Sequence, residues 1–80
     1  MTTVTLFGRP GCHLCDQARA TLESIAREHR FELVERDIES DDALLLAYLE
    51  RIPVIAIDGE EAFELVIDEA ELRRYLARVT

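Results

Sequence analysis

The most informative segment of the chain is Gly8-Arg9-Pro10-Gly11-Cys12-His13-Leu14-Cys15, which joins a short apolar stretch to an amphipathic one. Before it, Thr3 to Phe7 combines β-branched and apolar residues and predicts a strand. After it, apolar residues recur at spacings of three and four between Cys12 and His29, which predicts a helix. The glycines and the proline break the regular structure between the two elements. Both cysteines therefore fall at the start of the helix.

The middle of the chain repeats the order of strand and helix. Phe31 to Ile38 is moderately polar and predicts a strand at the edge of a sheet. Ser40-Asp41-Asp42 offers capping oxygens and negative charge for a second helix. This helix is apolar over more than half its surface, and we expect the Leu44-Leu45-Leu46 run to pack into the core, with Tyr48 in the core or at its edge. It should end at Ile52, because a following proline disfavours helical backbone.

The last third predicts a hairpin and a helix. Val54 to Ile57 is wholly apolar and is the candidate for the centre of the sheet. Asp58-Gly59 is a hairpin turn signal, and Ala62 to Ile67 returns as a fourth strand. Asp68 begins a helix, with Glu71 three residues on as its capping-box partner. The order βαβαββα predicts a single α/β domain over residues 1–80, with a four-stranded mixed sheet and helices on both faces.

Composition limits the classes of partner. The chain has 80 residues with 9 basic and 17 acidic side chains, for a formal net charge of −8. We expect no binding to nucleic acid or to anionic membranes, because both are bound by clustered Lys and Arg. No apolar run approaches the ~18 residues that a membrane-spanning helix needs, and the first residues do not resemble a secretory signal. We therefore expect a cytoplasmic protein, and a monomer, since no interface pattern stands out.

The spacing of Cys12 and Cys15 indicates redox chemistry. The free N–H groups and the dipole at a helix N-terminus stabilise a thiolate, which is the nucleophile in disulfide exchange. Cys12, at the exposed start, is the candidate attacking thiol, and Cys15, one turn in, is the candidate resolving thiol. Gly11 has no side chain, so a substrate backbone could approach closely. His13 either stabilises the thiolate or shuttles a proton, or it is an ordinary exposed residue.

A metal site is the main alternative for the cysteine pair. Two cysteines and a distant histidine fall short of the four ligands of a structural zinc site. Two chains could still share a metal ion or an iron–sulfur cluster through four cysteines. We expect no bound cofactor and no metal ligands within one chain. A noncatalytic binding domain with idle cysteines is the third interpretation.

The segment from Arg9 to Cys15, followed by Ile52-Pro53-Val54 and Asp58-Gly59, resembles the glutaredoxin-like proteins of the thioredoxin superfamily. The resemblance covers nearly the whole chain and is narrowest to short bacterial proteins of this type. It implies that Pro53 is a cis-proline beside the cysteines and that the backbone of Ile52 is free to pair with an extended substrate. It also implies that Arg9 contacts a glutathione carboxylate, although Arg9 is equally readable as a solvated loop charge.

The chain departs from that family where a Gly-Gly pair followed by Asp would come after the fourth strand. Phe63 and Glu64 stand near those positions, and Arg51-Ile52 precedes the proline. The sequence as a whole predicts a thiol-disulfide oxidoreductase with a dithiol mechanism that reduces protein or small-molecule disulfides. Glutathione or a flavin-dependent reductase is the expected electron donor.

Overall fold

The computed structural model describes all 80 residues. Its elements follow the predicted order, with one added turn of 3₁₀-helix before the second α-helix. The elements are β1 (Thr3–Gly8), α1 (His13–Ala26), β2 (Glu32–Asp37), η1 (Ile38–Ser40), α2 (Asp42–Tyr48), β3 (Val54–Ile57), β4 (Glu60–Glu64) and α3 (Glu69–Val79). No helix is long and apolar enough to cross a lipid bilayer.

The four strands form one mixed sheet in the order β2-β1-β3-β4. β1 runs parallel to β2 and antiparallel to β3, and the β3–β4 hairpin is antiparallel. All four residues of β3 are buried, and β2 lies at the edge, as the sequence predicts for each. The predicted α/β fold with a four-stranded mixed sheet is therefore confirmed.

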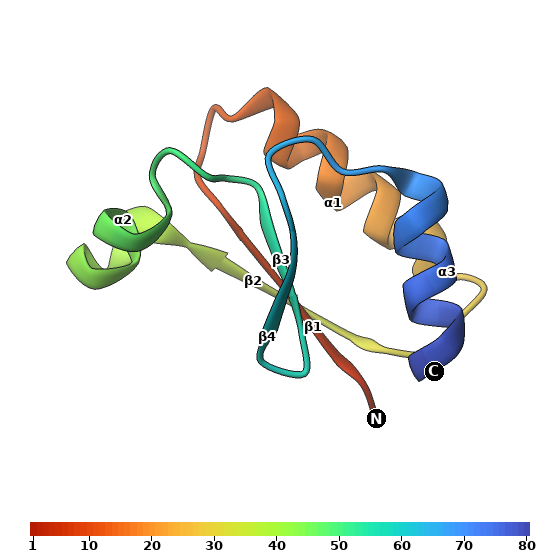
Figure 1. The fold of residues 1–80 in the computed structure, drawn as a ribbon. Helices are drawn as coiled ribbons and strands as arrows, with labels where there is room; N and C mark the ends of the chain where they lie inside the picture. The colour runs from red at the N-terminus through yellow and green to blue at the C-terminus, as the bar shows by residue number, and fades with distance from the viewer.

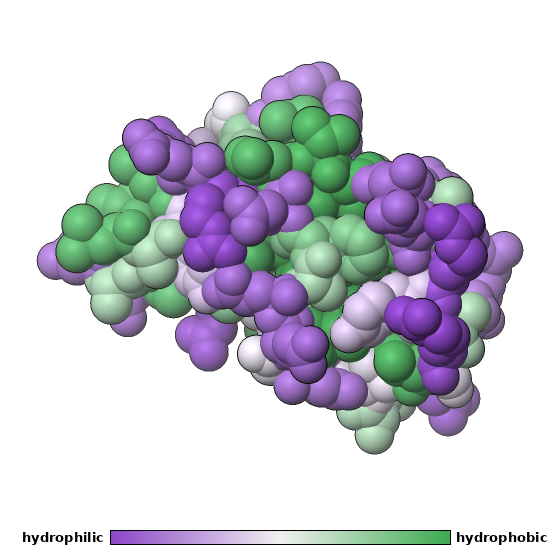
Figure 2. All heavy atoms as spheres, viewed as in Figure 1, coloured by the Kyte–Doolittle hydropathy of each residue, from purple (hydrophilic) through white to green (hydrophobic).

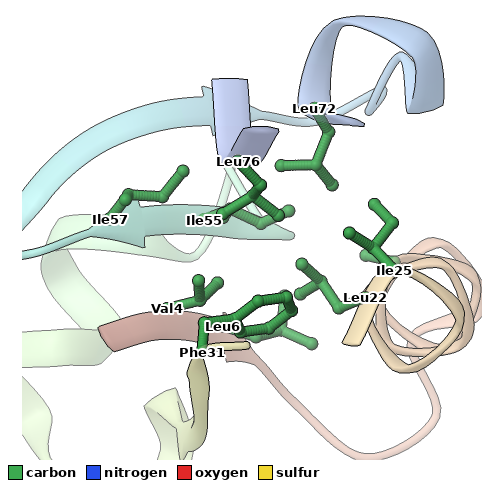
Figure 3. Packing of buried hydrophobic residues seen from close by; sticks show 10 residues of the cluster. Val4, Leu6, Leu22, Ile25, Phe31, Ile55, Ile57, Leu72 and Leu76 are labelled. Atoms are coloured by element: carbon green, nitrogen blue, oxygen red, sulfur yellow. The ribbon is translucent and has the colours of Figure 1, made fainter. Parts of the chain in front are cut away.

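The core lies between the sheet and two helices. In Figure 1, α1 and α3 lie side by side on one face of the sheet, whereas α2 lies apart from them at the far end of β2. Side chains alternate across a strand, so β1 and β3 each present every second residue to the two helices. Figure 3 shows the labelled residues of this cluster pointing toward one another: Val4, Leu6, Leu22, Ile25, Phe31, Ile55, Ile57, Leu72 and Leu76.

The first helix ends earlier than its apolar pattern predicts. α1 stops at Ala26, and His29 lies beyond it, although its amide still donates to the Ile25 carbonyl at 3.0 Å. The chain must turn there because Phe31 is buried in the core and the amide of Glu32 donates to the Thr2 carbonyl at 2.8 Å. The start of β2 thus overrides the last turn of helical periodicity.

The fourth strand starts earlier than predicted. Asp58 and Gly59 both have positive φ, 51° and 85°, so the turn contains only these two residues. Ile57 therefore pairs with Glu60, and β4 begins at Glu60 rather than at Ala62. The strand ends at Glu64, since the next residue, Leu65, also adopts positive φ.

The prediction that the leucine run of α2 packs into the core is wrong. No residue of this helix is buried, and Leu46 is 88% exposed. α1 and α3 already cover one face of the sheet, and α2 has only 7 residues. The predicted core-edge position of Tyr48 is confirmed: its ring is half-buried and stacks on Phe7 with centroids 4.5 Å apart.

Polar contacts around Tyr48 add to this stacking. Its hydroxyl donates to Glu61 at 2.8 Å, and the guanidinium of Arg51 lies 5.3 Å from the centre of its ring. The hydrogen bond to Glu61 raises the pKa of Tyr48 above its usual 10.0. The hydrogen bonds from Arg51 and Tyr48 lower the pKa of Glu61 below its usual 4.5. The hydrogen bond between Tyr48 and Glu61 is therefore fully formed between the usual pKa of glutamate, 4.5, and that of tyrosine, 10.0. It weakens as the pH falls through the lowered pKa of Glu61 or rises through the raised pKa of Tyr48.

We expect Tyr48 to titrate above pH 10.0 and Glu61→Gln to lower that midpoint, because the neutral amide no longer opposes the phenolate. The chain has two tyrosines, so Tyr75→Phe leaves Tyr48 as the only phenol to follow by ultraviolet absorbance. Glu64→Gln is the matched control, since it removes a neighbouring carboxylate that does not bind the hydroxyl. A midpoint that Glu61→Gln leaves unchanged would contradict the assignment.

Candidate functional site

The two cysteines form a disulfide at the N-terminus of α1, with their Cα atoms 5.2 Å apart. Cys12 is the N-cap residue, and its Sγ accepts a hydrogen bond from the amide of Cys15 at 3.1 Å. Cys12 is partly exposed, whereas Cys15 is fully buried. The sulfur of Cys12 therefore occupies the position where a capping oxygen accepts from the first turn, and a negative charge there is stabilised.

The turn before the helix is held by its own backbone. The amide of Cys12 donates to the Arg9 carbonyl at 3.3 Å, and the Cys12 carbonyl accepts from Asp16 at 3.1 Å. Gly11 has φ of +79°, which favours glycine, and a Cβ atom at this position would meet nothing within 4 Å. The space beside Gly11 is therefore open, as a close approach by a substrate requires.

Gly8 lies against the buried side chain of Cys15, a role that the sequence does not predict. A Cβ atom at Gly8 would lie 3.0 Å from Sγ and 3.1 Å from Cβ of Cys15. Any side chain here would have to displace the sulfur or the strand. The only sequence signal is a glycine at the end of a strand, and glycine is common there simply because it interrupts regular structure.

Pro53 lies at the same end of the sheet as the cysteines, and the Ile52–Pro53 peptide bond is cis, as the resemblance implies. Phe7 pairs with Val54, so the next step along the antiparallel register brings Gly8 opposite Pro53. The amide of Leu65 lies 2.9 Å from the Pro53 carbonyl and 3.1 Å from the Arg51 carbonyl. The connection after β4 is thereby fastened beside the proline.

The backbone of Ile52 is only partly available. Its amide donates to the Tyr48 carbonyl at 3.1 Å, whereas its carbonyl accepts no hydrogen bond from the chain. A substrate strand can therefore reach an unused acceptor here, but the donor is already engaged within the chain.

The two remaining predicted residues lie on the surface around the disulfide. Arg9 is exposed and forms an ion pair with Glu39 at 3.4 Å. His13 is exposed on the first turn of α1, and its Nε2 lies 3.0 Å from the side-chain nitrogen of Gln17. Neither residue forms a hydrogen bond with a cysteine sulfur.

A small cleft of about 170 Å³ opens beside Cys15, between α1 and the ends of β1 and β2. Arg19 and Glu35 line it and form an ion pair with each other, and Arg19 also contacts Asp16 at 3.0 Å. The hydrogen bonds to Glu35 and Asp16 raise the pKa of Arg19. Cys15 is among the residues that line this polar cleft, although its side chain is fully buried.

No cluster of three or more His, Cys, Asp or Glu side chains is arranged to hold a metal ion within this chain. A metal held by the cysteines would therefore need ligands from a second chain or from a small molecule.

Comparison with known proteins places this fold and site in a family. Residues 3–77 match the family described as "Glutaredoxin-like domain (DUF836)". The structure is similar to the solution structure of protein Ne2328 from Nitrosomonas europaea, with a TM-score of 0.80, 28% identity and coverage of 94% of this chain and 91% of that chain. The protein XcR50 from X. campestris is 36% identical, with a TM-score of 0.76 and coverage of 94% and 96%.

A mutant thioredoxin from Halobacterium salinarum shares the fold at a TM-score of 0.73 and 23% identity, over 96% of this chain and 73% of that chain. The four-stranded sheet, its helices and the Cys-x-x-Cys disulfide at a helix start define a thioredoxin-like protein with a redox-type site. The family match extends over nearly the entire chain, and the chain belongs to the glutaredoxin-like domain family.

We expect Gly8→Ala to destabilise the protein by about 1–3 kcal/mol, because the added methyl group overpacks the buried Cys15 side chain. Urea denaturation of Gly8→Ala and of its parent measures the cost. Repeating the comparison in a Cys15→Ala background removes the sulfur but keeps Cβ, so part of the cost should disappear. An equal cost in both backgrounds would show that the sulfur is not what Gly8 accommodates.

Proposed function

We propose that this chain is a thiol-disulfide oxidoreductase that works by a dithiol mechanism through Cys12 and Cys15. The observation that carries the proposal is the position of Cys12 Sγ, which is the N-cap acceptor of α1 and is partly exposed, while its disulfide partner is buried. A helix N-terminus lowers the pKa of a thiol placed there and so raises its thiolate fraction. Membership of the glutaredoxin-like family supports the same chemistry.

The cycle begins with the reduced pair. The Cys12 thiolate attacks one sulfur of a substrate disulfide, a mixed disulfide forms, and the first substrate thiolate leaves and takes a proton. Cys15 gives up its proton to water through the cleft beside Arg19 and Glu35 and attacks the Cys12 sulfur. The second substrate thiolate leaves and takes a proton. Two electrons and two protons have then passed to the substrate, and Cys12–Cys15 is oxidised.

Backbone pairing would hold the mixed disulfide. Because the Ile52 carbonyl is unused, an amide of an extended substrate can donate to it without breaking a bond of the protein. The open space at Gly11 admits the substrate backbone on the other side of the disulfide. Arg9 could contact a substrate carboxylate if it leaves Glu39, and an exposed ion pair of this kind is worth only about 0–1 kcal/mol.

The substrates are protein or small-molecule disulfides, and glutathione or a flavin-dependent reductase returns the disulfide to the dithiol. The protein acts in the cytoplasm as a monomer, without a bound cofactor. In a reducing compartment of this kind, a close cysteine pair is more often catalytic or metal-binding than structural.

The test is a redox equilibrium in defined glutathione buffers, quenched with a thiol-alkylating reagent and read by intact mass. We expect one reversible transition in which two thiols are gained or lost together. Cys15→Ser should trap glutathione on Cys12, because no resolving thiol remains. Cys12→Ser should lose disulfide reductase turnover by about 100-fold or more, since the only thiol that remains, Cys15, is fully buried and does not occupy the N-cap position.

Leu46→Ala provides the control for nonspecific effects, because Leu46 is exposed on α2 and outside the site. Unchanged turnover in Cys12→Ser would overturn the proposal. Stoichiometric metal after anaerobic purification, with both thiols protected from alkylation, would instead support a cluster shared between two chains. The absence of any reversible transition, with no metal, would favour a noncatalytic binding domain.

A further inference from the structure

We propose that an exposed apolar patch of Leu14, Leu65 and Val66 selects the substrate: it binds an apolar side chain next to the reactive cysteine of a protein disulfide, which is thereby preferred over glutathione disulfide. This inference rests on the proposed oxidoreductase function and names the substrate class of that site. The occupant is a neutral or basic polypeptide segment with an aliphatic or aromatic residue beside its disulfide.

The patch begins between the two cysteines in the sequence and continues across a cleft onto the segment after β4. Leu14 lies between the two cysteines in the sequence, on the first turn of α1, and is 42% exposed. Leu65 is 44% exposed, and its amide is fastened to the carbonyl of Pro53. Val66 follows it and is 81% exposed. Figure 2 shows hydrophobic residues gathered where the start of α1 meets the connection between β4 and α3.

These residues line a shared depression. A cleft of about 100 Å³ lies between the first turns of α1 and the segment after β4, and Leu14, Leu65 and Val66 all border it. Its size suits part of one side chain rather than a folded surface. Apolar groups buried there gain about 25 cal/mol per Å² of surface removed from water.

The backbone of Leu65 is a second, independent sign of a binding role. Its φ is +64°, in the left-handed region that glycine or asparagine adopts at lower cost. The two carbonyls that its amide contacts, those of Arg51 and Pro53, hold it in this conformation. A branched apolar side chain is thus kept half-exposed at a position where glycine would be less strained, and such outliers gather at functional sites.

The charges around the site disfavour glutathione, which carries two carboxylates and one ammonium group at pH 7. Arg51, two residues before the proline in the sequence, already pairs with Glu61 at 2.5 Å and Glu64 at 3.2 Å, and these hydrogen bonds raise its pKa. Arg9 pairs with Glu39. An anionic ligand would have to displace a glutamate from either cation, and the chain as a whole carries a net charge of −8.

The test compares three disulfides in single-turnover reactions, with the protein reduced beforehand and its oxidation followed by acid quench and mass. Two are short peptide disulfides that differ only in the residue before cysteine, Leu or Asp. The third is glutathione disulfide. Hydroxyethyl disulfide, which has no side chain to bind, reports the intrinsic reactivity of the dithiol. We expect the Leu peptide to react at least tenfold faster than the Asp peptide and than glutathione disulfide.

Leu65→Gly tests the patch without adding strain, because glycine accepts φ of +64°. The ratio of Leu-peptide to Asp-peptide rates should fall at least fivefold, and the stability in urea should not decrease. Val66→Ser should lower the same ratio and leaves the left-handed residue intact. Leu46→Ala, on the exposed face of α2, should leave the ratio unchanged.

Equal rates for the two peptides with the unmodified protein, or an unchanged ratio in both Leu65→Gly and Val66→Ser, would overturn the inference. So would a faster reaction with glutathione disulfide than with the Leu peptide. In each case a normal reaction with hydroxyethyl disulfide would leave the oxidoreductase proposal standing. Failure to react with any of the four disulfides would overturn both proposals.

Discussion

The contact between Gly8 and the buried sulfur of Cys15 is the constraint on which the site depends. β1 is paired on both sides, with β2 and with β3, so its last residue is fixed by two neighbouring strands. α1 is fixed in turn by the core residues that it buries against the sheet. With both elements immobile, only the lack of a side chain at Gly8 leaves room for the sulfur. The disulfide is thus supported by the rigid part of the molecule.

Much of the architecture could be predicted because its signals are local. A hydrophobic period of three to four residues indicates α1, an apolar run indicates β3, and Asp58-Gly59 indicates the hairpin. The cysteine pair is also a local feature, since helix geometry alone sets the approach of two residues three positions apart. The role of Gly8 is different in kind, because it depends on which side chain the fold brings against it.

The errors in the sequence-based prediction have a common physical cause. A hydrophobic pattern indicates which residues a segment could bury, but not whether another element of the fold covers them. The Leu44-Leu45-Leu46 run of α2 has the composition of a core helix, yet α1 and α3 both pack on the other face of the sheet. Leu65 is a further case. Its positive φ depends on two carbonyls from distant parts of the chain, and no local sequence signal marks it.

Charge and apolar surface would act on a substrate at different distances. The net charge of −8 repels acidic molecules over roughly a Debye length, about 8 Å at physiological ionic strength, and this effect weakens with added salt. Within contact distance Arg9 and Arg51 are each paired with glutamates, and Leu14, Leu65 and Val66 supply apolar surface for attraction. Both effects disfavour a small anionic disulfide and favour a neutral or basic polypeptide. The acidity of the chain and the exposed leucines around its disulfide thus have one explanation if the substrate is a protein.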